Sequence, residues 1–152
     1  MTVDVNRPLT QVRPFTPKDE PDCIRLMNEA IGQGFYWNKA ESLGTQSFRE
    51  TTSDEALIVA ELAGQVVGFA SLYIPDDFLH HLYVDPEFQR KGVGAALLSE
   101  VLAMVGSDGS LKCQVQNKVA RDFYNAHGWV EDSDIGGRDE MGEWLWLRIT
   151  KD

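Results

Sequence analysis

Residues 84–98, VDPEFQRKGVGAALL, predict the end of a strand, a turn, a glycine-bearing loop and the start of a helix. Residues 78–84 are aromatic and β-branched between two turn clusters, which is typical of a strand. Apolar residues then recur at helical spacing: Val93, Leu97, Leu98, Val101, Leu102 and Val105. Gly92 and Gly94 allow a ligand to approach the backbone closely, and the first-turn amides of a helix attract anions, phosphates above all. The alternative is a connection whose glycines only make it tight.

Length and composition predict one soluble domain over residues 1–152, with residues 1–8 as a loose N-terminus. The chain has 152 residues, of which 43% are hydrophobic and 25% charged, enough for one core but too few for two ordinary domains. No apolar run approaches the roughly 18 residues that span a membrane. The first residues also lack the apolar segment of a secretory signal. We therefore expect a cytoplasmic location and no membrane partner.

Charge and cysteine usage restrict the partners further. A formal net charge of −10 disfavours nucleic acid, because phosphate binding needs a basic surface. The same charge favours a cationic small substrate, or serves only solubility. Cys23 and Cys113 lie far apart and match no metal-binding spacing, so we expect buried reduced thiols and no metal.

The predicted order of elements indicates an α/β protein (α+β by some schemes). Strands are predicted over residues 10–15, 56–62, 66–74, 78–84, 111–115 and 143–149, with another beginning at residues 129–130. Helices are predicted over residues 16–32, about 39–50, from 93 onward and 117–128. Residues 131–142 are polar and are predicted as a loop. Hairpins mixed with strand–helix–strand crossovers predict a mixed, twisted sheet of six to seven strands flanked by about four helices.

Two motifs resemble those of the GCN5-related N-acetyltransferase (GNAT) superfamily, whose members bind acetyl-coenzyme A. Residues 89–94, QRKGVG, resemble the Gln/Arg-x-x-Gly-x-Gly/Ala motif, and the preceding residues 82–86 are also typical of the family. Downstream, one set of residues resembles the family's Asn-x-x-Ala-x-x-Phe-Tyr-x-x-x-Gly-Phe segment: Asn117, Ala120, Phe123, Tyr124, Gly128 and Trp129. The likeness is strong over residues 55–130 and only topological elsewhere. A dinucleotide-binding loop would need a third glycine where Leu97 stands, and the Gly-Lys-Ser/Thr of a P-loop is absent.

The resemblance implies how acetyl-coenzyme A binds. The strand of residues 82–84 would splay from that of residues 111–115, and the pantetheine arm would enter between them. A backbone N–H near Leu82 or Tyr83 would stabilise the developing oxyanion. Asn117 would contact the pantetheine or phosphate arm, and it also suits a helix cap. The implied coenzyme-binding residues are Leu82, Tyr83, Val84, Gln89, Arg90, Lys91, Gly92, Val93, Gly94, Ala95, Asn117 and Tyr124. The charges of Arg90 and Lys91 would either help locally or stay solvated.

Acetyl transfer to an amine also needs a proton acceptor and a proton donor. Histidine suits the first task because its unperturbed pKa is about 6.5. Strand periodicity predicts His80 and His81 on opposite faces, with His80 beside Leu82 and Val84, although a bulge would exchange the faces. Members of the family use a Glu or His at the positions of Phe78 or His80, so His80 is the preferred base. His81 is the alternative, and a structural role for both stays open.

Tyr124 would protonate the departing thiolate, or else serve as a core aromatic beside Phe123. The resemblance thus implies an N-acetyltransferase that works by direct attack in a ternary complex on the primary amine of a small molecule or peptide. Cys23 and Cys113 lack a matching base for a covalent route. The alternative is a non-catalytic acyl-coenzyme A-binding or sensing module.

The amine acceptor itself is not readable from the sequence. Residues 35–37 (Phe35, Tyr36, Trp37) would line its pocket or only cover the core. We expect a monomer or a homodimer; Trp144 and Trp146 would serve a dimer interface or the core.

Overall fold

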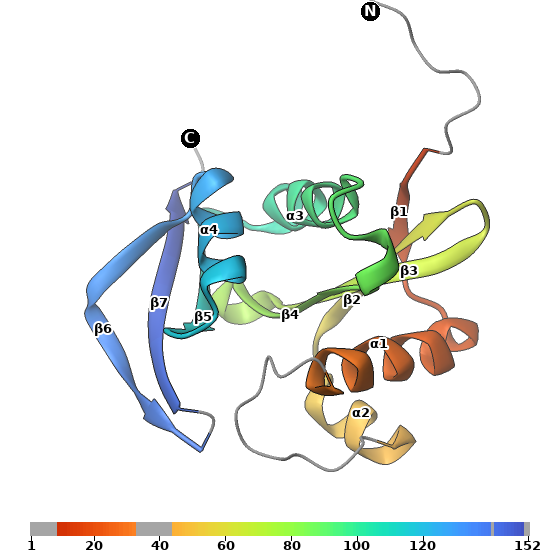
Figure 1. Cartoon of the computed structure of the whole chain (residues 1–152), viewed down its shortest axis with the longest axis horizontal. Coiled ribbons are helices and arrows are strands. Elements are labelled where there is room, and N and C mark those ends of the chain that lie inside the picture. The colour runs from red at the N-terminus through yellow and green to blue at the C-terminus, as the bar shows by residue number, and fades with distance from the viewer. Residues whose placement is uncertain (1–8, 33–43, 141, 151–152) are drawn as a thin grey trace, which may run out of the picture.

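One twisted, mixed sheet of seven strands runs through the part of the chain that the computed structural model describes, residues 9–32, 44–140 and 142–150 (Figure 1). The strands are β1 (Gln11–Pro14), β2 (Ala56–Leu62), β3 (Gln65–Tyr73), β4 (Phe78–Val84), β5 (Asp108–Gln114), β6 (Val130–Asp139) and β7 (Gly142–Thr150). Their spatial order is β1-β2-β3-β4-β5-β7-β6. Neighbouring strands are antiparallel except β4 and β5, which are parallel. The predicted mixed sheet is confirmed.

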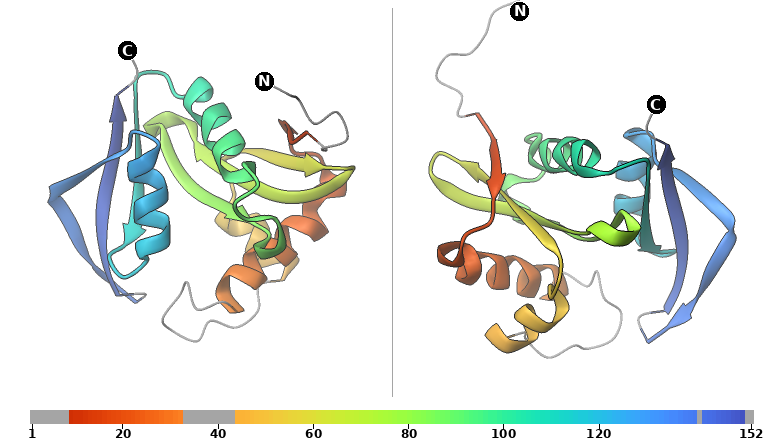
Figure 2. Two further views of the ribbon diagram at one scale, coloured as in Figure 1. Left: turned by 45° about the horizontal axis from the view of Figure 1, so that its top comes forward. Right: turned by 180° about the vertical axis from the view of Figure 1, so that it is seen from behind.

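Four α-helices cover the two faces of this sheet in the described ranges. They are α1 (Glu20–Gly32), α2 (Thr45–Thr51), α3 (Val93–Met104) and α4 (Lys118–Ala126). Short 3-10 turns precede α1 (η1, Pro17–Asp19), β4 (η2, Ile74–Asp76) and the α3 loop (η3, Pro86–Phe88). Figures 1 and 2 show α1 and α2 on one face and α3 and α4 on the other. None of the described helices is both long and apolar enough to cross a membrane.

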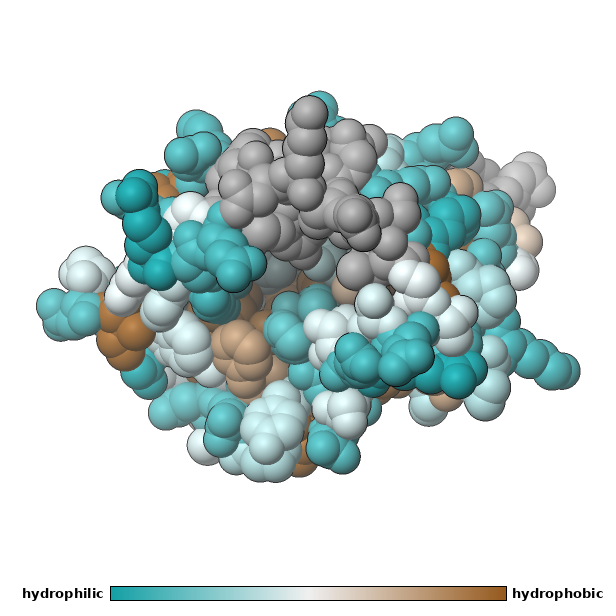
Figure 3. Space-filling view, turned by 90° about the horizontal axis from the view of Figure 1, so that it is seen from below, coloured by the Kyte–Doolittle hydropathy of each residue, from teal (hydrophilic) through white to brown (hydrophobic). Residues whose placement is uncertain are grey.

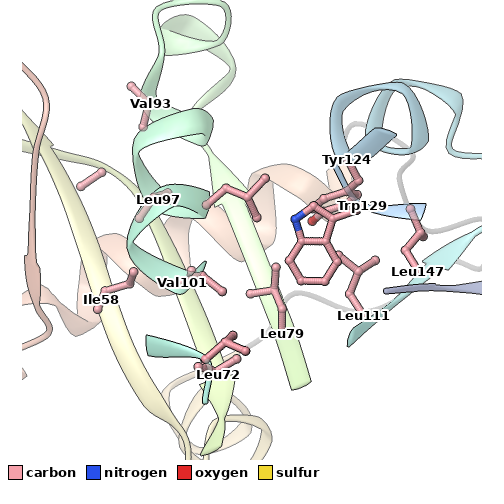
Figure 4. Packing of buried hydrophobic residues seen from close by; sticks show 14 of the residues in the cluster. Ile58, Leu72, Leu79, Val93, Leu97, Val101, Leu111, Tyr124, Trp129 and Leu147 are labelled. Atoms are coloured by element: carbon pink, nitrogen blue, oxygen red, sulfur yellow. The ribbon is translucent and has the colours of Figure 1, made fainter. Parts of the chain in front are cut away.

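Each face of the sheet buries its own apolar cluster, so the core has two halves. The α3 face holds the larger one, which includes Ile58, Leu79, Leu97, Leu111, Tyr124, Trp129 and Leu147 (Figure 4). The α1 face holds a smaller one, which includes Cys23, Leu26, Met27, Phe48, Val59, Val66 and Phe69. The alternation of β3 between the two clusters explains why that strand is buried over almost its whole length.

The prediction of a polar loop over residues 131–142 is wrong. Residues Val130–Asp139 form β6, which pairs antiparallel with β7 and lies at the edge of the sheet. Most of its residues are half-buried or exposed, so the strand has no apolar alternation to detect. A register shift between Asp132 and Gly136 interrupts the ladder further. At Gly137 an added Cβ would lie 2.8 Å from the Trp144 ring, so this glycine allows the indole to cover the strand.

The strands β4 and β5 part after two residue pairs. Their parallel pairing joins Phe78 to Ser110 and Leu79 to Leu111. Beyond Leu79, β4 follows β3 as far as Val84, while β5 follows β7. We call the space between the two strands beyond this point the β4–β5 gap. This divergence is the splay of central strands that the sequence resemblance implied.

Gly68 of β3 provides a test of the packing between the sheet and α3. A Cβ at this position would lie 3.0 Å from the Tyr83 carbonyl oxygen, 3.1 Å from Leu97 Cδ1 and 3.2 Å from Val93 Cγ1. Gly68→Ala should therefore lower the free energy of unfolding by about 1 to 3 kcal/mol through overpacking, as measured by urea denaturation. The matched control is Gly106→Ala, since an added Cβ there would make only an ordinary contact, 3.5 Å from Asp77 Oδ2. Equal stability of the two variants would contradict this account of the packing.

Candidate active site

A β-bulge in β4 determines where its two histidines lie. Ser71 of β3 pairs with His81, but the next residue, Leu72, pairs with Leu79, so His80 is the extra residue. The bulge brings both imidazoles to one face of the sheet, where they stack with ring centroids 3.8 Å apart and an interplanar angle of 27°. The prediction that they lie on opposite faces is therefore wrong.

The histidine pair lies on the α1 and α2 face. His81 Nε2 is 3.4 Å from Thr51 Oγ1 at the end of α2, and the His81 ring stacks near that of Tyr83, which packs in the α1-side cluster. By contrast, Leu82 and Val84 pack in the α3-side cluster. His80 thus does not share a face with Leu82 and Val84, as period two alone had predicted.

His80 is held by a carboxylate that the sequence did not single out. Its Nδ1 atom lies 2.6 Å from Glu55 Oε2. Glu55 stands directly before β2, whose first residue Ala56 pairs with Leu72 of β3 next to the bulge. The one sequence signal was an acidic residue at the start of an otherwise apolar strand. Only the strand register brings it to His80.

Unpartnered polar atoms gather around the same point. In the described part of the chain, three buried side-chain atoms have no hydrogen-bond partner: Glu55 Oε1, Ser71 Oγ and Trp146 Nε1. Ser71 pairs with His81 across the strands, and Trp146 stacks on Phe78 with ring centroids 5.4 Å apart. The Phe78 ring in turn contacts the His80 ring. Such buried polar atoms are rare in folded proteins, and a catalytic role is one of the explanations for them.

The cluster of Glu55, His80 and His81 is chemically able to bind a cation, because one ligand atom from each lies within 4.8 Å of the others. A metal ion, however, lies in the plane of an imidazole that ligates it. Two imidazoles stacked face to face cannot both direct a lone pair at one ion without turning. The arrangement fits a hydrogen-bonded carboxylate–imidazole pair better than a metal centre.

The two histidines differ in their electrostatic surroundings. Burial, and secondly the charge of His80, lower the pKa of His81 from 6.5 to about 3, while a hydrogen bond with Thr51 acts in the opposite direction. His81 is therefore neutral at neutral pH. His80 keeps 38% of its side chain exposed and remains accessible to a substrate.

The loop between β4 and α3 leads into the N-terminus of α3. Arg90 and Gly92 both take left-handed conformations, with φ of 63° and 85°. Gly92 then caps α3, and its carbonyl accepts from the Ala96 N–H. The amides of the first turn therefore have no partner inside the helix. The side chains of Gln89, Arg90 and Lys91 are exposed, and the Lys91 ammonium lies 5.5 Å from the centroid of the Phe88 ring.

Buried Asp85 fixes the start of this loop. Its carboxylate accepts from the Glu87 N–H at 3.0 Å and from Arg25 Nη1 at 2.9 Å. Arg25 belongs to α1, so this ion pair connects the helix on one face of the sheet to the loop that leads to the other face.

Gly94 joins the two motifs of the sequence. A Cβ at Gly94 would lie 3.2 Å from Phe123 Cζ and 3.7 Å from Val84 Cγ2. The glycine therefore lets α4 approach both α3 and the end of β4. This contact explains physically why the two motifs occur together.

The residues of the second motif lie on the α3 face. Asn117 caps α4 as predicted, because its Oδ1 accepts from the Ala120 N–H at 3.1 Å. Tyr124 is buried beside Trp129, with ring centroids 6.1 Å apart. Figure 4 shows both between the residues of α3 and β4 and those of β5 and β7. His80, on the α1 and α2 side, and Tyr124, on the α3 side, thus lie on opposite faces of the sheet.

Figure 3 shows apolar surface at the bottom of a hollow in the face that carries α1 and α2. The predicted acceptor residues, Phe35, Tyr36 and Trp37, lie outside the described residues.

Comparison with known proteins identifies the family. The sequence profile of the Acetyltransferase (GNAT) family matches residues 23–129, more than half of the chain. The chain belongs to the GNAT acetyltransferase family. Both motifs and the β4–β5 gap lie within the matched residues.

Relatives agree with this family assignment. The chain is 27% identical over 157 residues to an uncharacterized N-acetyltransferase of Methanocaldococcus jannaschii, and the match covers 92% of this chain. It spans 66% of the length of that relative, just under two thirds.

Solved GNAT structures share the fold. A GCN5-related N-acetyltransferase from Rhodopseudomonas palustris superposes with a TM-score of 0.78 at 19% identity, over 98% of this chain and 100% of the other. The YncA acetyltransferase from Salmonella typhimurium, solved with acetyl-CoA, gives a TM-score of 0.74 at 19% identity, over 94% of each chain.

The burial of His81 should make this protein less stable to unfolding at acidic pH. Because the pKa of His81 is lowered from 6.5 to about 3 on folding, below about pH 6.5 the unfolded chain binds a proton that the folded chain does not. The free energy of unfolding should therefore fall as the pH drops from 6.5 toward 3, by up to about 1.4 kcal/mol per pH unit from this residue. Urea denaturation at several pH values measures the slope.

His81→Leu should flatten this slope by about one proton. A His81→Leu variant with the slope of the natural protein would show that burial of His81 is not the cause.

Proposed function

We propose that this protein is an N-acetyltransferase that transfers the acetyl group of acetyl-CoA to a primary amine of a small molecule or peptide. The observation that carries the proposal is the β4–β5 gap, with His80 on one face and Tyr124 on the other. Membership of the GNAT acetyltransferase family supports acetyl transfer. Transfer would occur by direct attack in a ternary complex of protein, acetyl-CoA and amine.

Acetyl-CoA would bind across the end of β4 and the start of α3. The amides of residues 89–95 would hold the pyrophosphate, aided by the positive end of the α3 dipole. Beyond Leu79, the edge of β4 no longer pairs with β5. The pantetheine amides would pair with this edge near Tyr83 and Val84, as an added strand does. Asn117 would contact the same arm from the start of α4. The similar Salmonella acetyltransferase was solved with acetyl-CoA.

The chemistry would use groups from both faces. His80 would take a proton from the attacking amine as its nitrogen bonds to the thioester carbon. A backbone N–H near Leu82 or Tyr83 would stabilise the oxyanion. As the carbon–sulfur bond breaks, Tyr124 would protonate the coenzyme thiolate. His80 is preferred over His81, because a base that protonates only near pH 3 is poorly matched to neutral pH.

Direct attack is supported by the state of the two cysteines. Both are buried and free. Burial raises the pKa of Cys23 to about 12 and that of Cys113 to about 11. Because the thiolate is the nucleophile, neither cysteine is suited to carry an acetyl group at neutral pH.

Binding and turnover separate this proposal from a non-catalytic acyl-CoA-binding module. Isothermal titration should give binding of acetyl-CoA to the purified protein, and a panel of amines should include acceptors that release free thiol. Absence of binding would contradict the whole proposal. Binding with no thiol release for any amine would favour the binding module instead.

Removing the proposed acid should slow turnover without weakening coenzyme binding. Tyr124→Phe keeps the buried ring but loses the hydroxyl, so kcat should fall by about 10²-fold or more while the Kd of acetyl-CoA stays within a few-fold. Tyr73→Phe, at the end of β3 and away from the second motif, is the matched control and should behave as the natural protein. An unchanged kcat in Tyr124→Phe would remove the acid assignment.

A further inference from the structure

We propose that Glu55 is the positioning residue of the catalytic base: it holds His80 with Nδ1 protonated, so that Nε2 presents its lone pair to the substrate amine. The catalytic role of Glu55 in this inference rests on the proposed function. Its structural content, a fixed tautomer of His80, can be tested without any turnover.

The burial of Glu55 is the first argument. Its side chain is only 7% exposed, and Oε2 lies 2.6 Å from His80 Nδ1. The second carboxylate oxygen, Oε1, is buried with no hydrogen-bond partner. Burying a carboxylate is costly unless it is paired. His80 is the polar partner that offsets this cost, so the two side chains stabilise each other.

The chemistry of the contact fixes where the proton is. An ionised carboxylate only accepts hydrogen bonds. The atom that faces it at 2.6 Å must therefore be an N–H, which assigns the proton to Nδ1 of His80. In the neutral imidazole, the other nitrogen is then an acceptor. An orienting carboxylate also stabilises the imidazolium that forms when the base takes up a proton, as in other carboxylate–histidine pairs.

Packing fixes the plane of the ring as well. The His81 ring stacks on one side of the His80 imidazole, 3.8 Å away, and the Phe78 ring lies 5.9 Å away. His81 adds no charge at neutral pH because its own pKa is about 3. A ring with its plane and one nitrogen fixed has its second nitrogen fixed too, and this is the pre-organisation that general-base catalysis requires.

The position of the Glu55–His80 pair in the fold places it beside the proposed substrate site. The bulge that exposes His80 follows directly on Leu79, the last residue of β4 that pairs with β5. The carboxylate–imidazole pair therefore lies where the β4–β5 gap opens, with the buried carboxylate behind and the more exposed imidazole in front.

The direct test is the tautomer of His80, measured by NMR on ¹⁵N-histidine-labelled protein. Spectra are recorded at about pH 8, above the ordinary histidine pKa, with EDTA present to exclude metal binding. The chain has three histidines, and loss of signals in His80→Gln assigns the one required. The natural protein should give the Nδ1–H tautomer at His80.

Glu55→Met has similar length and no acceptor, and it should convert His80 to Nε2–H, the form that an imidazole without such a partner prefers. Glu50→Ala, which removes an exposed carboxylate from nearby α2, is the matched control and should keep Nδ1–H. An Nε2–H tautomer in the natural protein would overturn the proposal, as would an unchanged tautomer in a folded Glu55→Met. The tautomer of the natural protein tests the proposal even if the Glu55→Met variant fails to fold.

Kinetics then test the catalytic meaning. With any amine that the natural protein acetylates, Glu55→Met should lower kcat by about 10- to 100-fold, by analogy with the loss of a partner that orients a metal-ligating histidine. The KM for acetyl-CoA should stay the same, because Glu55 lies on the α2 side of the sheet. Glu50→Ala should match the natural protein. An unchanged kcat together with the converted tautomer would contradict the positioning role. Absence of all turnover would contradict the proposed function but leave the tautomer result standing.

Discussion

The rest of the structure depends on the interruption of β4–β5 pairing after Leu79 and Leu111. A continuous ladder would close the centre of the sheet. Instead, β4 follows β3, β5 follows β7, and the apolar space on the α3 face is filled by Trp129 and Tyr124. The sheet thus has an open strand edge in its middle, with a buried tyrosine from a distant motif beside it. Open edges are costly at the rim of a sheet, but here the edge is where an extended ligand would pair.

The β-bulge at His80 changes which side chains of β4 face each layer of helices. It directs two consecutive histidines toward α1 and α2, while Leu79, Leu82 and Val84 stay in the α3-side core. The proposed base, His80, and the proposed acid, Tyr124, thereby lie on opposite faces of the sheet. The ion pair between Arg25 and Asp85 fixes α1 to the loop at the end of the same strand. The proposed acceptor side, thioester position and phosphate loop would in this way all lie on β4 or directly after it.

Much of the fold and of the candidate site was predictable from local sequence patterns. The remaining features depend on the register between strands. The glycine loop at residues 89–94, the cap at Asn117 and the crossover from β4 through α3 to β5 each have a local sequence signal, and all three predictions are confirmed. The start of the edge strand β6 at Val130 was predicted, but its extent to Asp139 was missed, because an exposed strand needs no apolar alternation. The faces of His80 and His81 were assigned wrongly because a bulge adds one residue without marking the sequence. Glu55 was missed because it meets His80 only through the pairing of β2, β3 and β4.

Backbone hydrogen exchange on adding acetyl-CoA tests the central claim, that the β4–β5 gap and the loop after it are the coenzyme site. The account predicts that saturating acetyl-CoA slows exchange of amides among residues 82–84 and 92–95, the edge of β4 and the start of α3. The amides of the β6–β7 hairpin, away from the proposed contacts, should change little. Tight binding that leaves the amides of residues 82–84 and 92–95 unprotected would contradict the account.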